Sequence, residues 1–431
     1  MGHILEVHIE MAFSSLKKMV TSPLSEPVDL LLADVAIRVQ LTNTDYNKAV
    51  ERYHSVADWL DRPESLLQGR VNRLYAQGSI AIGATIASKM RTDEFDIDVI
   101  ADLALPIGTA PQHVLDLLYG SIRGERGSRY YSMAERRTRC VTIHYADDMH
   151  LDVTPAILLP VPEPRTSHIF HSKPEEHDEP DRTLMANPYG FAEWYKASTP
   201  LDHDFVALFE KRAGDWERLV KAAETETVPA QQPPYRKSKA TIALQLIKRW
   251  RNVRYDRRAG RRPPSIVLAR LIADAANHTD TLSEELHLQA AQLLENFSEW
   301  HRAGLCIQVV NPRCAQDVFT DRWPSSLAEQ EVFIHDLGDL VAKLAILRGE
   351  CPLDRIQEIM KDLFGEAPTL AAFKAFTKRT GHQISTGQSY HQPRTGRLDL
   401  AATGLLGATV APSPATVRTR PHTFFGADED V

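Results

Sequence analysis

The sequence predicts an α+β protein of two lobes, with a mixed β-sheet and its helices in the first lobe and a helical bundle in the second. Two observations predict this fold. Short β-like segments are concentrated between residues 73 and 158, whereas most segments after Phe191 carry apolar residues at three- and four-residue spacing. A chain of 431 residues is long enough for one large two-lobed unit or for two to three domains. We expect the functional site in the cleft between the lobes.

Composition narrows the class of protein. A formal charge of −7 argues against general coating of DNA, although a local basic site remains compatible with it. The four cysteines are too sparse for a disulfide framework, so we expect free thiols. No apolar run approaches the ~20 residues of a membrane helix, and the N-terminus lacks the basic start of a signal peptide. We therefore expect a cytoplasmic protein with no membrane partner.

The N-terminal part is predicted to be helical after a flexible start. Residues 1–28 show no strong pattern, and residues 30–63 are largely helical in character. Within them, Thr44 is the expected N-cap of a helix over 45–60, and Pro63 is expected to end it.

The next segments predict the sheet lobe. We expect a strand at 73–76, a helix or turn at 80–89, a strand at 97–103, a helix at 112–122 and strands at 140–145 and 151–158. The polar turn 146–149 predicts that the last two strands form an antiparallel hairpin. Residues 161–190 are rich in proline and charge, so a connection without strands is expected there.

The rest of the chain predicts the helical lobe. We expect helices at 205–223, 238–255, 265–276, 283–302, 326–347 and 352–364. Residues 381–431 are rich in Gly, Thr, Ser and Pro. The predicted organisation is a flexible N-terminus (1–28), a catalytic core with an N-terminal helix (29–190), a helical lobe (191–380) and a flexible or surface-bound tail (381–431).

Three aspartates are the candidate catalytic residues. Asp96 and Asp98 are two apart in a predicted strand and therefore share one face of it, while apolar residues occupy the other face. Asp152 is isolated among apolar residues on a later strand, which the predicted hairpin could bring alongside. Paired carboxylates are poor core residues and good ligands for hard divalent cations.

A glycine-serine turn precedes the acids. Backbone N–H groups and the hydroxyl of Gly78-Ser79 could hold phosphate oxygens. The chain lacks GxxxxGK(S/T), which argues against a Walker-type ATPase. Together, the turn and the acids predict metal-dependent phosphoryl or nucleotidyl transfer, in which two cations roughly 3.5–4 Å apart stabilise the entering and leaving oxygens.

Several stretches match one family signature: Gln77-Gly78-Ser79, Gly83-Ala84-Thr85, Asp96-Ile97-Asp98, Leu151-Asp152-Val153, Asn187-Pro188-Tyr189-Gly190, Leu246-Ile247-Lys248-Arg249-Trp250, Pro264-Ser265-Ile266, Asn311-Pro312 and Thr320-Asp321-Arg322-Trp323. On these residues the chain resembles the polymerase-β-like nucleotidyltransferases, and more narrowly the bacterial CD-NTases, relatives of cyclic GMP–AMP synthase and oligoadenylate synthase. The match covers roughly residues 30–330 and an aromatic-glycine element in the tail.

The resemblance implies a role for each motif. The carboxylates of Asp96, Asp98 and Asp152 would hold two magnesium ions, for which manganese could substitute. The remaining implied contacts are with nucleotide. Gln77, Gly78 and Ser79 would line the donor pocket, and Lys248 and Ser265 would clamp the β- and γ-phosphates from the helical lobe.

The resemblance also implies an activity. The expected enzyme joins two or three nucleoside triphosphates, purines with ATP among them, into a cyclic oligonucleotide for antiphage signalling, and releases pyrophosphate. Regulatory or effector proteins encoded nearby are the expected protein partners, and the enzyme itself is expected to be a monomer. Two alternatives stay open: a linear or transfer nucleotidyltransferase that acts on an RNA end, a protein or a small hydroxyl compound, and a non-catalytic nucleotide-binding module.

A basic cluster between Arg249 and Arg262 has two interpretations. It predicts either an ion-paired surface or a region that draws triphosphates or a regulatory nucleic acid to the cleft. Binding of nucleic acid is therefore left open by the sequence.

Overall fold

The computed structural model describes residues 23–24, 27–87, 95–174, 180–221, 236–256, 258, 260–277, 279–385, 389–391, 398–400 and 417–418, and the side chains of 95–96, 217–221 and 383 onward lie outside the description. Most of the predicted flexible N-terminus and C-terminal tail therefore falls outside the described residues. In the part that is described, strands β10 (Ser389–His391), β11 (Leu398–Leu400) and β12 (Val417–Arg418) form a small sheet.

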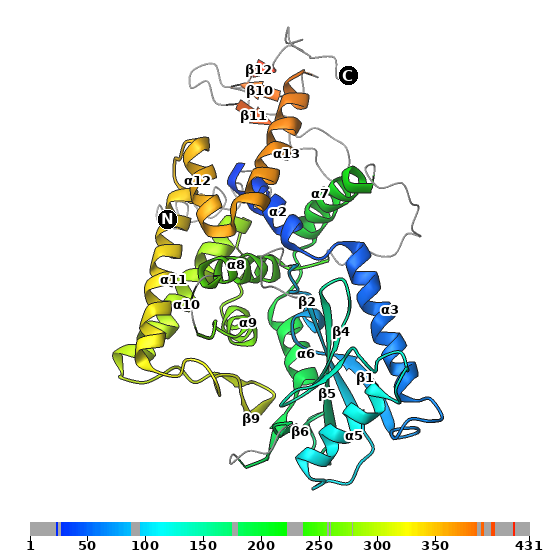
Figure 1. Cartoon of the computed structure of the whole chain (residues 1–431). Coiled ribbons are helices and arrows are strands. Elements are labelled where there is room, and N and C mark those ends of the chain that lie inside the picture. The colour runs from blue at the N-terminus through cyan, green and yellow to red at the C-terminus, as the bar shows by residue number, and fades with distance from the viewer. Residues whose placement is uncertain are drawn as a thin grey trace, which may run out of the picture.

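A seven-stranded mixed sheet forms the first lobe (Figure 1). Its strands are β1 (Val71–Ala76), β2 (Phe95–Leu103), β3 (Ala134–Arg136), β4 (Val141–His144), β5 (Met149–Leu158), β6 (Ser167–His171) and β7 (Arg182–Ala186). The order is β1-β2-β5-β4-β3. Strand β6 pairs with the C-terminal end of β5, and β7 pairs with β6. Strands β2 and β5 pair in parallel and the other pairs are antiparallel. The mixed sheet and the predicted hairpin, now β4–β5, are confirmed.

Some local predictions were wrong. Residues 161–190 contain the β6–β7 pair, because the prolines of this segment lie outside the two strands. The N-cap of α3 (Asn43–Leu60) is Thr42 and not Thr44: Thr42 is extended, and its hydroxyl accepts a hydrogen bond from the Asp45 N–H at 3.1 Å. Thr44 already lies inside the helix.

The helices divide between two hydrophobic cores. Helices α3 and α5 (Pro111–Arg123) pack on the sheet, whereas α2 (Pro27–Val39) packs with the helical lobe. The other helices are α4 (Gly78–Ala81), α6 (Pro188–Ser198), α7 (His203–Lys221), α8 (Lys239–Tyr255), α9 (Ser265–Asp274), α10 (Leu282–Arg302), α11 (Leu327–Arg348), α12 (Leu353–Phe364) and α13 (Glu366–Ser385), and a hairpin of β8 (Val310–Asn311) and β9 (Cys314–Val318) precedes α11. Within the described residues, no helix is long and apolar enough to cross a membrane.

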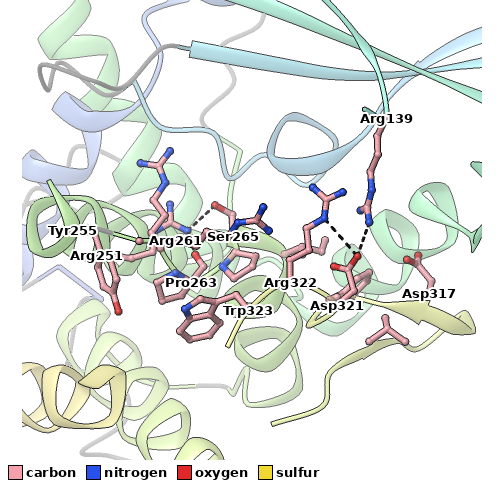
Figure 2. Close-up of a pocket in the computed structure, with 16 residues that line it drawn as sticks. Arg139, Arg251, Tyr255, Arg261, Pro263, Ser265, Asp317, Asp321, Arg322 and Trp323 are labelled. Carbon is pink, nitrogen blue, oxygen red and sulfur yellow. Dashed lines mark hydrogen bonds and ion pairs between the residues drawn. The ribbon is translucent and has the colours of Figure 1, made fainter. Parts of the chain in front are cut away.

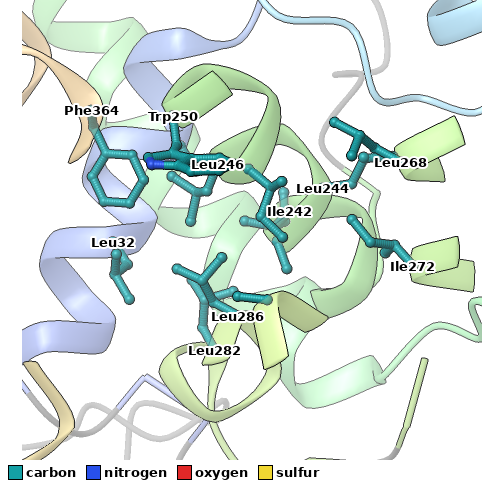
Figure 3. Close-up of a cluster of buried hydrophobic side chains, with 14 of the residues drawn as sticks. Leu32, Ile242, Leu244, Leu246, Trp250, Leu268, Ile272, Leu282, Leu286 and Phe364 are labelled. Carbon is teal, nitrogen blue, oxygen red and sulfur yellow. The ribbon is translucent and has the colours of Figure 1, made fainter. Parts of the chain in front are cut away.

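Helix α8 runs through the centre of the helical lobe. Every residue from Lys239 to Asn252 is buried, and the apolar ones pack against α2, α9, α10 and α12 (Figure 3). Lys248, Arg249 and Arg251 of α8 are buried as well. Because a buried cation without a partner is costly, each of them needs a polar partner inside the protein. The central position of α8 thus fixes where those partners lie.

A buried carboxylate joins three helices of this lobe. Asp34 of α2 is 1 % exposed. It accepts hydrogen bonds from Arg212 of α7 at 2.6 and 2.8 Å and from Arg379 of α13 at 2.9 Å, and it pairs with Arg38 at 3.5 Å. One carboxylate therefore compensates three guanidinium groups.

We predict that Asp34→Ala destabilises the helical lobe by about 3–5 kcal/mol, because it leaves buried guanidinium groups without their counter-ion. Urea denaturation followed by circular dichroism measures the change. The control is Glu358→Gln, which removes the exposed ion pair with Arg355 and should cost less than about 0.5 kcal/mol. Equal midpoints for the two variants would contradict the role of Asp34.

Candidate active site

The parallel pairing of β2 with β5 places two of the predicted aspartates side by side. Asp98 is the direct register partner of Asp152, and both side chains are half-buried. Asp96 lies two residues earlier on β2, opposite His150, but its side chain lies outside the part of the chain that the structure describes. The expected neighbourhood of the two strands is confirmed, while the metal-binding role of the three acids stays a prediction.

The Asp152 carboxylate is oriented by the adjacent strand. Thr142 of β4 is its register partner, and the Thr142 hydroxyl donates to Asp152 Oδ1 at 2.5 Å. Cys140 lies beside the pair, and the pKa of its thiol is raised, first by burial and then by the negative charges of Asp152 and Asp98. This side of the site is therefore electronegative. Thr142 was not identified from the sequence, because it lies in no motif that the sequence offers.

The turn at Gly78 packs directly against Asp98. Gly78 has φ +59°, and a Cβ built on it would lie 2.5 Å from Asp98 Oδ2. The Gln77 N–H donates to the Asp98 carbonyl oxygen at 2.9 Å. Only glycine allows the backbone to approach the carboxylate this closely. The turn and β2 are thus held as one unit.

These residues fit a hard divalent cation. Asp98 and Asp152 supply carboxylate oxygens from adjacent strands, and the glycine leaves space against Asp98 that a Cβ would fill. No group of three acidic, histidine or cysteine side chains comes together within the described residues, and the carboxylate of Asp96 is not among them.

Lys248 connects the helical lobe to this turn. Its ammonium donates to Ser79 Oγ and to the Ala84 carbonyl oxygen, both at 2.8 Å. Burial, reinforced by the positive charge of Arg251 and opposed by Asp98, lowers the pKa of Lys248 to about 7. The sequence-predicted pair Lys248 and Ser79 is therefore brought together across the two lobes, with a cation that gains or loses its proton near neutral pH.

The other two side chains predicted to bind nucleotide, Gln77 and Ser265, have different partners. Gln77 donates through Nε2 to Thr154 Oγ1 at 3.2 Å, which ties its side chain to β5. Ser265 is the first residue of α9, after Pro264 at the N-cap position, and its hydroxyl accepts from Arg251 Nη1 at 3.0 Å. Ser265 thus faces a pocket beside the Lys248 contact.

That pocket has a volume of about 660 Å³ and lies between the lobes (Figure 2). Arg139, which precedes β4, meets it from the sheet lobe. The α8–α9 connection contributes Arg261 and Arg262, and the segment after β9 contributes Asp321 and Arg322. Sequence reasoning missed Arg139, whereas Asp321 and Arg322 lie in a motif that it singled out without a role.

The basic cluster divides into two groups. Arg249 donates to the Phe364 carbonyl oxygen at 2.8 Å, Arg254 pairs with Asp339, and Arg258 pairs with Asp336, so these three support the helical lobe. In contrast, the pocket is lined by Arg251, Arg261 and Arg262. The ion-paired interpretation is therefore confirmed for Arg254 and Arg258, whereas a role of the pocket arginines in drawing triphosphates or a nucleic acid to the cleft stays a prediction.

A second buried lysine lies behind the turn. Lys237 donates to Gln40 Oε1 at 2.8 Å, and its Cε lies 3.9 Å from the position of a Cβ on Gly83. Burial lowers the pKa of Lys237 to about 7. Two amines with depressed pKa values therefore lie around the segment that carries Gly83 and Ala84.

We predict that Lys237 makes the stability of the protein increase with pH. Burial holds the pKa of Lys237 at about 7 in the folded protein, below the usual value of a lysine in the unfolded chain, so between these two values the unfolded chain holds a proton that the folded chain has released. Raising the pH then favours the folded state by at most about 1.4 kcal/mol per pH unit. Urea unfolding of wild type and Lys237→Met at pH 6.5, 7.5 and 8.5 measures this, and a constant difference between them would contradict it.

We predict that Gly78→Ala costs more stability than Gly69→Ala. Gly69 has φ +64° and nothing within 4 Å of its Cβ position, so it carries the same backbone strain of about 1–2 kcal/mol without a clash. At Gly78 the added methyl group displaces Asp98, at a further cost of about 1–3 kcal/mol. Urea denaturation compares the two variants, and equal losses would show that the Asp98 contact is unimportant.

Comparisons with known proteins place the chain in a family. Residues 29–179 match the model of the Second Messenger Oligonucleotide or Dinucleotide Synthetase domain. The cyclic dinucleotide synthase CdnG of Bradyrhizobium diazoefficiens is 36 % identical over 406 residues, which are 94 % of this chain and 96 % of the relative. A c-di-GMP synthase of Roseivirga ehrenbergii is 23 % identical over 410 residues, 95 % of this chain and 100 % of the relative.

Solved structures show the same fold. The structure of Bradyrhizobium diazoefficiens CdnG in complex with GTP superposes with a TM-score of 0.72 at 35 % identity, and it covers 82 % of this chain and 100 % of its own. Escherichia coli CdnC, solved with ATP, has a TM-score of 0.54 at 15 % identity over 78 % of this chain and 97 % of its own, which supports the fold alone. With the identity and coverage of CdnG, the chain belongs to the CD-NTases, the nucleotidyltransferases that synthesise cyclic oligonucleotide second messengers.

Proposed function

We propose that this enzyme is a magnesium-dependent synthase that joins two purine nucleoside triphosphates, GTP among them, into a cyclic dinucleotide. The observation that carries the proposal is the convergence of the Asp98–Asp152 pair with the Lys248–Ser79 contact at one turn. The choice of GTP draws on the names of the relatives, a c-di-GMP synthase and a CdnG solved with GTP. ATP, the nucleotide expected from the sequence, is the candidate for the second substrate.

In this proposal the helical lobe holds the triphosphate. Lys248 and Ser79 meet the phosphates at the Gly78 turn, and Arg251 and Ser265 extend the cationic surface toward the pocket. Because Lys248 is buried with a pKa of about 7, a bound triphosphate would stabilise its protonated form. Binding energy is thereby directed at the leaving pyrophosphate.

The sheet lobe holds the reacting groups. A ribose hydroxyl attacks the α-phosphorus, a new P–O bond forms, the bond to the β-phosphate breaks and pyrophosphate leaves; a second round closes the ring. Asp152, oriented by Thr142, accepts the proton of the attacking hydroxyl. Magnesium held by the carboxylates of Asp96, Asp98 and Asp152 would offset negative charge on the entering and leaving oxygens. From family membership we further propose that the product serves antiphage signalling in the cytoplasm.

We predict that the purified enzyme converts nucleoside triphosphates into a phosphatase-resistant product only with a divalent cation. Asp98→Ala and Asp152→Ala should each lower the rate of pyrophosphate release by about a thousandfold or more, because charge stabilisation worth several kcal/mol is lost. Mass spectrometry after incubation with GTP and ATP identifies the product, and EDTA should abolish it.

The matched control is Asp147→Ala on the turn of the same hairpin. Asp147 is ion-paired with Arg52 at 2.8 Å, which lowers its pKa. Since that pair lies outside the site, its loss should leave turnover within about twofold. Normal turnover of Asp98→Ala would contradict the site, and a phosphatase-sensitive product would favour the linear or transfer reaction.

A further inference from the structure

The pocket between the lobes is large enough for a nucleoside. Its volume of about 660 Å³ falls within the range of small-molecule sites. Arg251 lines it and bonds Ser265, and Arg251 is also one of the charges that lower the pKa of Lys248. Arg251 therefore links the lining of the pocket to α8, the helix that carries Lys248.

Its lining is cationic with one unexpected feature. Five arginines line it: Arg139, Arg251, Arg261, Arg262 and Arg322. Burial, and then the proximity of Arg139, lowers the pKa of Arg322, which reflects this crowding. Phosphate binding alone would need only such cations, and a carboxylate among them would weaken it.

Two carboxylates nevertheless line the pocket among the described residues. Asp317 is occupied by the fold, because Oδ2 accepts hydrogen bonds from Asn311 Nδ2 at 2.9 Å and from the Asn187 N–H at 3.3 Å. Asp321 differs, since its side chain is 37 % exposed and lies next to Arg139 of the sheet lobe (Figure 2). Arg139 Nη2 contacts its Oδ2 at 2.6 Å, and Arg322 Nε lies 3.9 Å from the same oxygen.

We propose that Asp321 is the specificity-determining residue of the pocket and that it selects guanine by accepting hydrogen bonds from the base. This inference rests on the proposed function, and it names the base that the site takes. Asp321 acts on recognition only and takes no part in the bond-forming step.

The chemistry of the bases favours guanine. Guanine presents two adjacent donors, N1–H and the 2-amino group, which match the two oxygens of a carboxylate. On the same Watson–Crick edge, adenine, cytosine and uracil each have only one donor beside at least one acceptor. In those bases an acceptor would therefore face the negative charge of the carboxylate. Arginines also suit guanine, because its O6 and N7 both accept hydrogen bonds. An ionised carboxylate between two arginines therefore fits guanine better than it fits the other bases.

A structural role for Asp321 predicts different behaviour. Arg139 belongs to the sheet lobe and Asp321 follows β9, so the ion pair between them also links the lobes. If it served only as a link, removal of either partner would affect all nucleotides alike. If Asp321 recognises the base, only the loss of the carboxylate changes the choice between bases.

The experiment compares guanine with hypoxanthine, which lacks only the 2-amino group. Dissociation constants of the full-length protein are measured for non-hydrolysable GTP, ITP and ATP analogues by isothermal titration calorimetry. We expect wild type to bind the GTP analogue about tenfold or more tightly than the ITP analogue, since the lost hydrogen bond is to a charged acceptor. In Asp321→Ala that ratio should fall to about one, and in Asp321→Asn to an intermediate value.

Two controls separate recognition from structure. Arg139→Ala removes the same ion pair but keeps the carboxylate, so the GTP-to-ITP ratio should persist. Asp362→Asn removes a remote, exposed ion pair with Lys343 and should change nothing. Equal binding of the two analogues by wild type, or a ratio that survives Asp321→Ala, would overturn the proposal.

Pyrophosphate release from GTP is measured in parallel as the test of the proposed function. Discrimination between GTP and ITP in binding, without any product, would refute the synthase and leave guanine recognition standing. Product formation with equal use of GTP and ITP would support the synthase and refute guanine recognition by Asp321.

Discussion

The parallel register between β2 and β5 is the constraint on which the rest of the site depends. Strands β2 and β5 pair residue for residue, and in the observed register Asp98 lies beside Asp152. A slip of one residue would turn the acids to the opposite face of the sheet and bring Ile97 and Leu151 out of the core. The burial of those apolar neighbours therefore holds the carboxylates in place. The position of the acid pair and the hydrophobic packing are, in this lobe, consequences of one alignment.

The helical lobe supplies positive charge opposite the acids of the sheet lobe. Cations on a buried helix are costly unless each finds a partner, and α8 satisfies this in different ways along its length. Arg249 is used within the lobe, Arg251 reaches Ser265, and Lys248 crosses to the sheet lobe. The turn at Ser79 is therefore the place where the charge of one lobe meets the acids of the other.

Much of this could be predicted from the sequence, and the exceptions have physical reasons. Alternating apolar residues predicted β2 and β5 because their inner faces are buried. The β6–β7 pair was missed because its strands are short and proline-rich segments flank it, and the cap of α3 was misplaced because Thr42 and Thr44 are chemically equivalent in the sequence. The Lys248–Ser79 contact was expected only from a family resemblance, since no local pattern relates residues 169 positions apart. Arg139 lacked any motif, and only the assembled lobes bring it to Asp321.

The division of the interior into two separate cores has a consequence for the dynamics of the protein. Because α2 packs with the helices and α3 with the sheet, the short connection between them is where the chain passes from one core to the other. We therefore expect each lobe to open as its own cooperative unit, with amide protons that exchange with solvent at rates set by its local stability. A bound nucleotide that contacts both lobes would stabilise both units together and so slow amide exchange in each of them.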